Sequence, residues 1–120
     1  MKKLLVVDDS NIIRKRIERI IDKDKFELVG TAVNGSHALE MFAHFQPDII
    51  TMDLTMPEMD GIECIEKIIS VNADIKILVI SALSDKATGI EALQKGAQGF
   101  LCKPFTEEQL QYSLQEILEP

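Results

Sequence analysis

The sequence contains no tryptophan, one tyrosine and only two cysteines, and its hydrophobic runs are short. Cys64 and Cys102 lack the Cys-x-x-Cys spacing of a redox or zinc site, so we expect buried, reduced thiols. The longest apolar runs, such as 4–7 and 77–80, fall far below the roughly 18 residues that a membrane span requires. The apolar stretch that follows the N-terminal lysines is too short for a signal peptide. These absences predict a soluble, cytoplasmic protein with no membrane insertion.

Positive charge is also scarce. The chain has 13 Lys and Arg against 20 Asp and Glu, a formal net charge of -7, and residues 104–120 contain acids but no base. Binding to nucleic acid requires clustered cations that contact phosphates. We therefore predict no direct nucleic-acid binding.

The chain does contain enough apolar material for a core. Its 120 residues, 46% of them hydrophobic, fit one compact domain and leave no room for a second. Short β-branched runs alternate with longer stretches in which apolar residues have helical spacing, which predicts a parallel sheet covered by helices. Buried strands are expected at residues 4–8, 27–33, 48–52, 77–81 and 99–101.

Five helices are expected after these strands. The fourth, around 87–95, is the weakest, because Gly89 lies inside it and glycine costs about 1 kcal/mol relative to alanine in a helix. The fifth opens at Thr106 with a capping-box pattern. Right-handed crossovers give a doubly wound α/β sandwich, most simply in strand order 2-1-3-4-5.

Polar residues follow the predicted strands at their carboxyl ends, where ligands bind in such sheets. Asp8 and Asp9 follow the first strand and Asp53 the third, and these strands are neighbours in the predicted order. Three carboxylates so close repel one another unless a cation lies between them. Oxygen ligands without histidine or thiol select Mg²⁺, Mn²⁺ or Ca²⁺, and few protein ligands favour Mg²⁺, which also takes phosphate oxygens.

A carboxylate can itself be the nucleophile in phosphoryl transfer. Asp53 is the best candidate because it lies alone at the tip of its strand, before the loop 54–61. The charge of a transferred phosphoryl group could be stabilised by a metal ion, by the Lys103 ammonium after the fifth strand and by the Ser81 hydroxyl at the end of the fourth.

Several short motifs now point to one family. They are Val6-Val7-Asp8-Asp9-Ser10, 48–53, 56–61, Ser81-Ala82, Gly96-Ala97 and Lys103-Pro104-Phe105. Together and in order, they make the chain resemble, over residues 1–120, the receiver domains of two-component response regulators, in the CheY-like single-domain form known from chemotaxis. The resemblance implies a flavodoxin-like (βα)5 sandwich with strand order 2-1-3-4-5, so the predicted topology is not independent of it.

The resemblance implies roles for the acidic residues. Asp53 would accept a phosphoryl group from a histidine kinase, a histidine phosphotransfer protein or a small phosphodonor. Asp9, Asp53 and the carbonyl of Thr55 would bind Mg²⁺, with Mn²⁺ as a possible substitute, and Asp8 would act partly through water. Lys103 and Ser81 would contact the phosphoryl oxygens.

The resemblance also implies a switch rather than a turnover enzyme. Phe100 stands where the family has its switch aromatic, which turns inward when Ser81 moves toward the phosphate. Pro104 is expected to follow a cis peptide bond. The face made by the fourth helix, fifth strand and fifth helix would contact a downstream protein. The DNA-binding subfamily that dimerises through this face usually has an acidic pair before the switch aromatic and arginines on the fifth helix. This chain has Gln98-Gly99 before Phe100 and no arginine in its fifth helix, so we expect a monomer.

Three alternatives remain. The chain could be a receiver cut from a longer regulator with a transcription-factor or enzyme output. It could be an aspartate-nucleophile phosphatase, although these usually have a second acid where this chain has Thr55. A flavodoxin-like electron carrier is the third, but Asp8 and Asp9 would repel the flavin phosphate.

Overall fold

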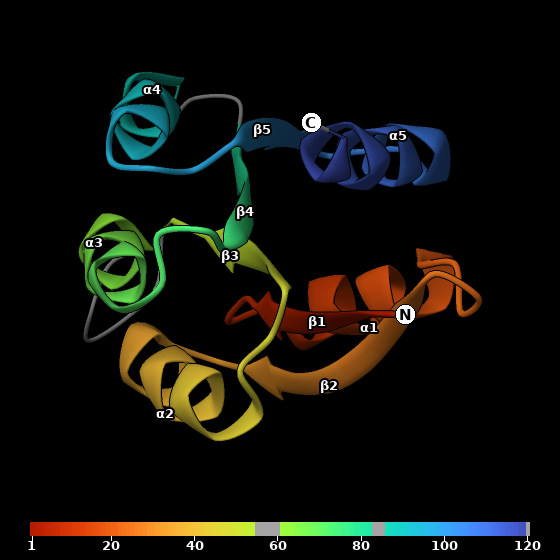
Figure 1. Ribbon diagram of the computed structural model, residues 1–120. Helices are drawn as coiled ribbons and strands as arrows, with labels where there is room; N and C mark the ends of the chain where they lie inside the picture. Colours follow the sequence, from red (N-terminus) through yellow and green to blue (C-terminus); the bar gives the residue numbers. More distant parts are fainter. Residues whose placement is uncertain (55–60, 83–85, 120) are drawn as a thin grey trace.

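The computed structural model describes residues 1–54, 61–82 and 86–119, in which five strands alternate with five helices (Figure 1). Every strand boundary lies within two residues of its predicted position. The elements are β1 (Lys2–Val7), α1 (Asn11–Ile20), β2 (Phe26–Ala32), α2 (Gly35–Phe45), β3 (Ile49–Asp53), α3 (Gly61–Val71), β4 (Lys76–Ala82), α4 (Lys86–Gln94), β5 (Gly99–Lys103) and α5 (Glu107–Leu118).

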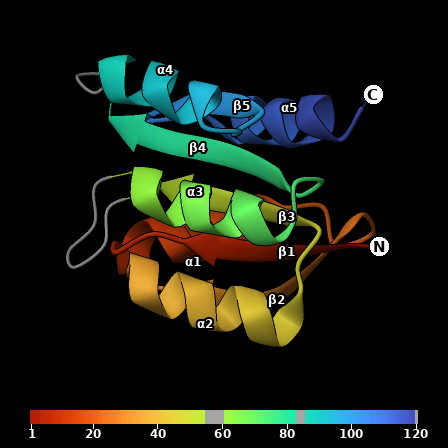
Figure 2. The same cartoon turned by 60° about the vertical axis from the view of Figure 1, so that its left-hand side comes forward.

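The five strands form one parallel sheet in the order β2-β1-β3-β4-β5, which confirms the predicted topology. Helices α2, α3 and α4 cover one face, and α1 and α5 cover the other (Figures 1 and 2). The fold is therefore a flavodoxin-like α/β sandwich. Because all strands run in the same direction, their carboxyl ends lie at one edge of the sheet.

The core consists of two apolar layers, one on each face of the sheet. Along β1, Leu5 and Val7 face the layer under α2, α3 and α4, whereas Leu4 and Val6 face the layer under α1 and α5. Side chains of β3 and β4 alternate in the same way. Burial on both faces explains why the strands appear in the sequence as continuous apolar runs.

Two local predictions have different outcomes. Helix α5 begins with the predicted capping box, in which Thr106 and Gln109 exchange side-chain to backbone hydrogen bonds. Cys64 is buried as expected, but Cys102 is only half-buried. The prediction for Cys102 was wrong because β5 is an edge strand, which the helices cover less completely.

Among the helices of the described residues, none has the length and hydrophobicity that a membrane span requires.

Candidate functional site

Three of the predicted site residues meet at the carboxyl edge of the sheet. The Lys103 Nζ lies 3.0 Å from Asp8 Oδ2 and 3.7 Å from Asp53 Oδ1. Asp8 and Asp53 are 1% and 4% exposed, and the Lys103 side chain is 24% exposed. Buried charges require partners, and one ammonium here serves two buried carboxylates.

Asp9 completes an acidic cluster with Asp8 and Asp53. One carboxylate oxygen from each of the three lies within 4.8 Å of the others, and Asp9 is exposed to solvent. With Lys103, the formal charge is -2, from three carboxylates and one ammonium. An all-oxygen donor set with unbalanced negative charge fits a hard divalent cation, and Mg²⁺ is satisfied by few protein ligands because it keeps several waters.

The turn between β1 and α1 holds Asp8 in a fixed orientation. Asp8 Oδ1 accepts a hydrogen bond of 2.8 Å from the Ser10 amide, and Ser10 is the N-cap of α1. Arg14 Nη1 donates to the Asp8 carbonyl at 2.6 Å, and Arg14 Nη2 donates to Asn11 Oδ1 at 3.3 Å. This role of Arg14 is not visible in the sequence, because a contact that reaches back past the start of the helix leaves no periodic signal.

Ser81 and Gly61 flank the acidic cluster. Ser81 is buried near the end of β4, the strand between those that carry Asp53 and Lys103. Gly61 opens α3, and a Cβ at this position would lie 2.6 Å from the Asp53 carbonyl oxygen. Any larger residue at 61 would therefore press on the backbone of Asp53. In the sequence, Gly61 is recognisable only as part of the motif 56–61, and the contact that requires a glycine is not visible there.

Phe100 lies apart from the acidic cluster, on β5 and against α4. Its half-buried ring packs against the core layer under α2, α3 and α4. A Cβ at Gly89 would lie only 1.9 Å from Phe100 Cε2, so the ring occupies the space where a side chain would be. Gly89, expected only to weaken its helix, is thus the contact surface for the predicted switch aromatic.

The remaining predicted positions have mixed outcomes. The peptide bond between Lys103 and Pro104 is cis. Thr55, predicted to offer its carbonyl to the metal, lies outside the described residues.

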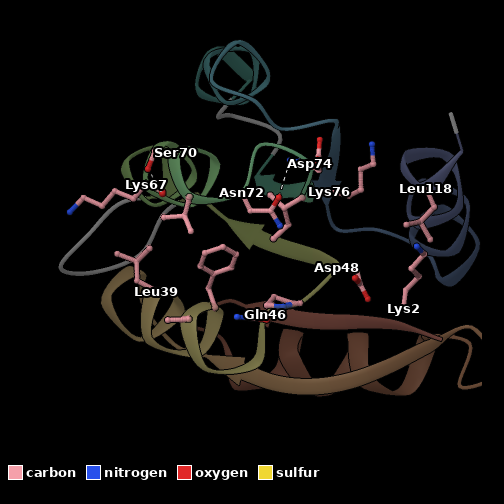
Figure 3. A pocket seen from close by; sticks show the side chains of 15 residues that line it. Lys2, Leu39, Gln46, Asp48, Lys67, Ser70, Asn72, Asp74, Lys76 and Leu118 are labelled. Carbon is pink, nitrogen blue, oxygen red and sulfur yellow. Dashed lines mark hydrogen bonds between the residues drawn. The ribbon is translucent and has the colours of Figure 1, made fainter.

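A cavity of about 980 Å³ lies at the amino ends of the strands (Figure 3), whereas the acidic cluster lies at their carboxyl ends. Phe42 and Ile75 contribute to its apolar wall, and Lys2 and Lys76 to its rim. None of the aspartates of the cluster lines this cavity, so size alone does not identify the functional site.

Comparison with known proteins agrees with the geometry. The family model "Response regulator receiver domain" matches residues 4–115. Chemotaxis protein CheY of Thermotoga maritima is 40% identical over 116 residues, which cover 97% of each chain. The CheY of Bacillus subtilis is 38% identical with the same coverage. A crystal structure of the CheX-CheY-BeF3-Mg²⁺ complex from Borrelia burgdorferi has a TM-score of 0.92 and 30% identity, and the match covers 99% of this chain and 90% of that chain.

These matches extend over nearly the whole chain and include the strands that carry the acidic cluster. A relative of this fold has been crystallised with Mg²⁺ and BeF3, and the cluster in this chain is consistent with a magnesium site. Receivers of this kind are phosphorylation switches of two-component signalling rather than conventional enzymes. The chain therefore belongs to the response regulator receiver domain family, as a CheY-like receiver whose phosphoryl-accepting acidic pocket is formed by Asp8, Asp9 and Asp53.

Proposed function

We propose that this protein is a single-domain signalling switch in which Asp53 accepts a phosphoryl group in the presence of Mg²⁺. The observation that carries the proposal is the buried Asp53 carboxylate, grouped with two other carboxylates and the Lys103 ammonium. The single-domain form and the extent of the domain, residues 1–120, are supported by CheY relatives matched over 97% of their own length. A cytoplasmic location is part of the proposal.

The chemistry is transfer of a phosphoryl group to a carboxylate oxygen of Asp53. The new O–P bond forms as the donor's bond to phosphorus breaks, a P–N bond in a phosphohistidine or a P–O bond in a small phosphodonor. The Lys103 ammonium, 3.7 Å from Asp53 Oδ1, is close enough to stabilise the charge that the phosphoryl oxygens bring.

Asp9, Asp53 and the Thr55 carbonyl would hold the cation, with Asp8 acting partly through water. The bound Mg²⁺, or Mn²⁺ in its place, would supply positive charge to the phosphoryl oxygens. Asp8 carries a second function in this proposal, because its Oδ2 already holds Lys103 at 3.0 Å.

The output of the switch would depend on Ser81 and Phe100. The Ser81 hydroxyl would hydrogen-bond a phosphoryl oxygen, and Phe100 would change its packing between α4 and the core. Because Phe100 lacks a hydroxyl, its positions differ only in packing. The upstream partner would be a histidine kinase or histidine phosphotransfer protein, and the downstream protein would contact the α4, β5 and α5 face. We propose a monomer without nucleic-acid contacts.

Intact-mass measurement after incubation with Mg²⁺ and acetyl phosphate tests the proposal. We expect the parent protein to gain one phosphoryl group, the Asp53→Asn variant to gain none, and a chelator to abolish the gain. Mn²⁺ should restore it. Asp74→Asn removes the same negative charge at an exposed position between α3 and β4, far from the site, and this control should leave the gain intact. Equal gain in the parent and in Asp53→Asn would contradict the assignment of Asp53.

A further inference from the structure

The contact between Asp8 and Lys103 joins two strands that are not neighbours. β3 and β4 lie between β1 and β5, so the two strands are three spacings, or about 14 Å, apart. No strand pairing sets the distance between these two residues directly, yet their side chains approach to 3.0 Å. The sheet places the backbone of Lys103, which pairs with Ala82, and leaves the course of its flexible side chain toward Asp8 to contacts outside the sheet.

Helix α1 supplies such contacts, because it lies beside α5 on the same face of the sheet (Figure 1). The guanidinium carbon of Arg16 lies 4.7 Å from the centre of the Phe105 ring, in the geometry of a cation–π interaction. Phe105 is only 2% exposed and stands two residues beyond Lys103. Arg16 therefore holds the segment that follows β5 against α1.

The same helix also holds the other side of the ion pair. Arg14, two residues before Arg16, donates to the Asp8 carbonyl at 2.6 Å. Farther along, Gln111 of α5 donates to the Ile20 carbonyl at 3.0 Å, which fixes the two helices side by side. Helix α1 thus contacts both the turn that carries Asp8 and the segment next to Lys103.

We infer that Arg16 is a positioning residue for Lys103: its stacking on Phe105 fixes the segment after β5 so that the ammonium reaches Asp8 and Asp53. Arg16 touches none of the reacting groups and acts through Phe105. The consequence for phosphorylation rests on the proposed function, but the placement of the Lys103 side chain does not.

The accessibility of the Lys103 amine tests the placement directly. The rate of acetylation of each lysine by a small acetylating reagent is measured by peptide mass spectrometry in the parent, Arg16→Leu, Arg16→Lys and Arg19→Leu proteins. Arg19→Leu removes the same charge from an exposed position of α1 and is the matched control. The half-exposed Lys95 provides an internal reference in each protein.

We expect acetylation of Lys103 to accelerate about three- to tenfold in Arg16→Leu, to return toward the parent rate in Arg16→Lys, and to remain unchanged in Arg19→Leu. An unchanged Lys103 rate in Arg16→Leu overturns the inference. If Arg16→Leu fails to fold, Phe105→Leu removes the aromatic ring but keeps an apolar core residue, and the same acceleration is expected.

Phosphorylation by acetyl phosphate then shows whether the placement has a functional effect. We expect Arg16→Leu to be phosphorylated about tenfold more slowly, because small displacements of a positioned group reduce rates strongly. A parent protein that is never phosphorylated contradicts the proposed function, and the acetylation rates still decide the inference. A phosphorylated parent with equal rates in Arg16→Leu shows that Arg16 has no part in the reaction.

Discussion

The substitution Gly89→Ala examines how the Phe100 ring is held against α4. A Cβ at position 89 would lie 1.9 Å from Cε2 and 2.4 Å from Cδ2 of the ring, whereas ordinary contacts begin at 3.4 Å. The nearest ring atom must therefore retreat by at least 1.5 Å, the difference between 3.4 and 1.9 Å. Because an aromatic ring is rigid, the whole side chain of Phe100 has to turn or α4 has to move.

Two opposing energies decide the effect on stability. Alanine in place of glycine stabilises a helix interior by about 1 kcal/mol. Inserting a methyl group into a filled contact costs about 1–3 kcal/mol. We therefore expect Gly89→Ala to lower the free energy of unfolding by about 1 kcal/mol in the parent. In a Phe100→Ala background only the helix term remains, and the same substitution should raise the free energy of unfolding by about 1 kcal/mol.

A double-mutant cycle measures this difference. Urea unfolding of the parent, the two single variants and the double variant, followed by circular dichroism because the chain has no tryptophan, should give a coupling energy of about 2 kcal/mol. The Phe100 ring resonances should also shift in the NMR spectrum of Gly89→Ala. Equal stabilisation in both backgrounds, together with unchanged ring resonances, would refute the contact between Phe100 and Gly89.

Three further outcomes are expected. Thr51→Val should raise the free energy of unfolding by about 1 kcal/mol, because the buried Thr51 hydroxyl has no hydrogen-bond partner among the described residues. Urea titration measures this change, and a destabilised variant would contradict the prediction. Gly61→Ala should slow phosphorylation by acetyl phosphate and lower the free energy of unfolding by about 1–3 kcal/mol, because the alanine Cβ would press on the Asp53 carbonyl. A variant with the rate and stability of the parent would contradict this prediction. Glu116→Gln should lower the pKa of Tyr112, because the hydrogen bond and the negative charge of Glu116 raise that pKa. The absorbance of tyrosinate reports the titration of Tyr112 directly, because the chain has one tyrosine. An unchanged titration would exclude Glu116 as the cause.

The sequence was sufficient for the fold and for the acidic cluster. Both depend on general rules, since β-branched runs buried on two faces form a parallel sheet and the carboxyl ends of its strands share one edge. Asp8, Asp9 and Asp53 therefore converge wherever the strand order is correct. The same rule places Lys103 and Asp8 at one edge of the sheet, but their approach to 3.0 Å depends on contacts outside the sheet that the sequence does not show.

Contacts that depend on side-chain shape were not predictable in this way. Gly89 has low helix propensity in any sequence, and only the position of the Phe100 ring shows why a glycine is needed there. Arg16 and Phe105 are far apart in the chain, and their stacking depends on how α1 and α5 lie against each other. Arg14 has the spacing of an ordinary ion pair with Glu18, yet its guanidinium donates back to the Asp8 carbonyl.

The charge of the site limits how strongly phosphorylation can bias the switch. Phosphorylation replaces the single negative charge of the Asp53 carboxylate by the charge of about -1.5 to -2 of an acyl phosphate, so it adds at most about -1 to a cluster whose formal charge is already -2. The Lys103 ammonium already forms an ion pair with Asp8, so a contact with a phosphoryl oxygen would replace an existing interaction. The net stabilisation is therefore only part of the roughly 1.5–3 kcal/mol that a charged hydrogen bond contributes. Complete reversal of a 1:99 equilibrium requires about 5.5 kcal/mol. Under the proposed function, Lys103 alone would produce a partial shift, and Ser81 and the cation would contribute the remainder if the two states are to exchange fully.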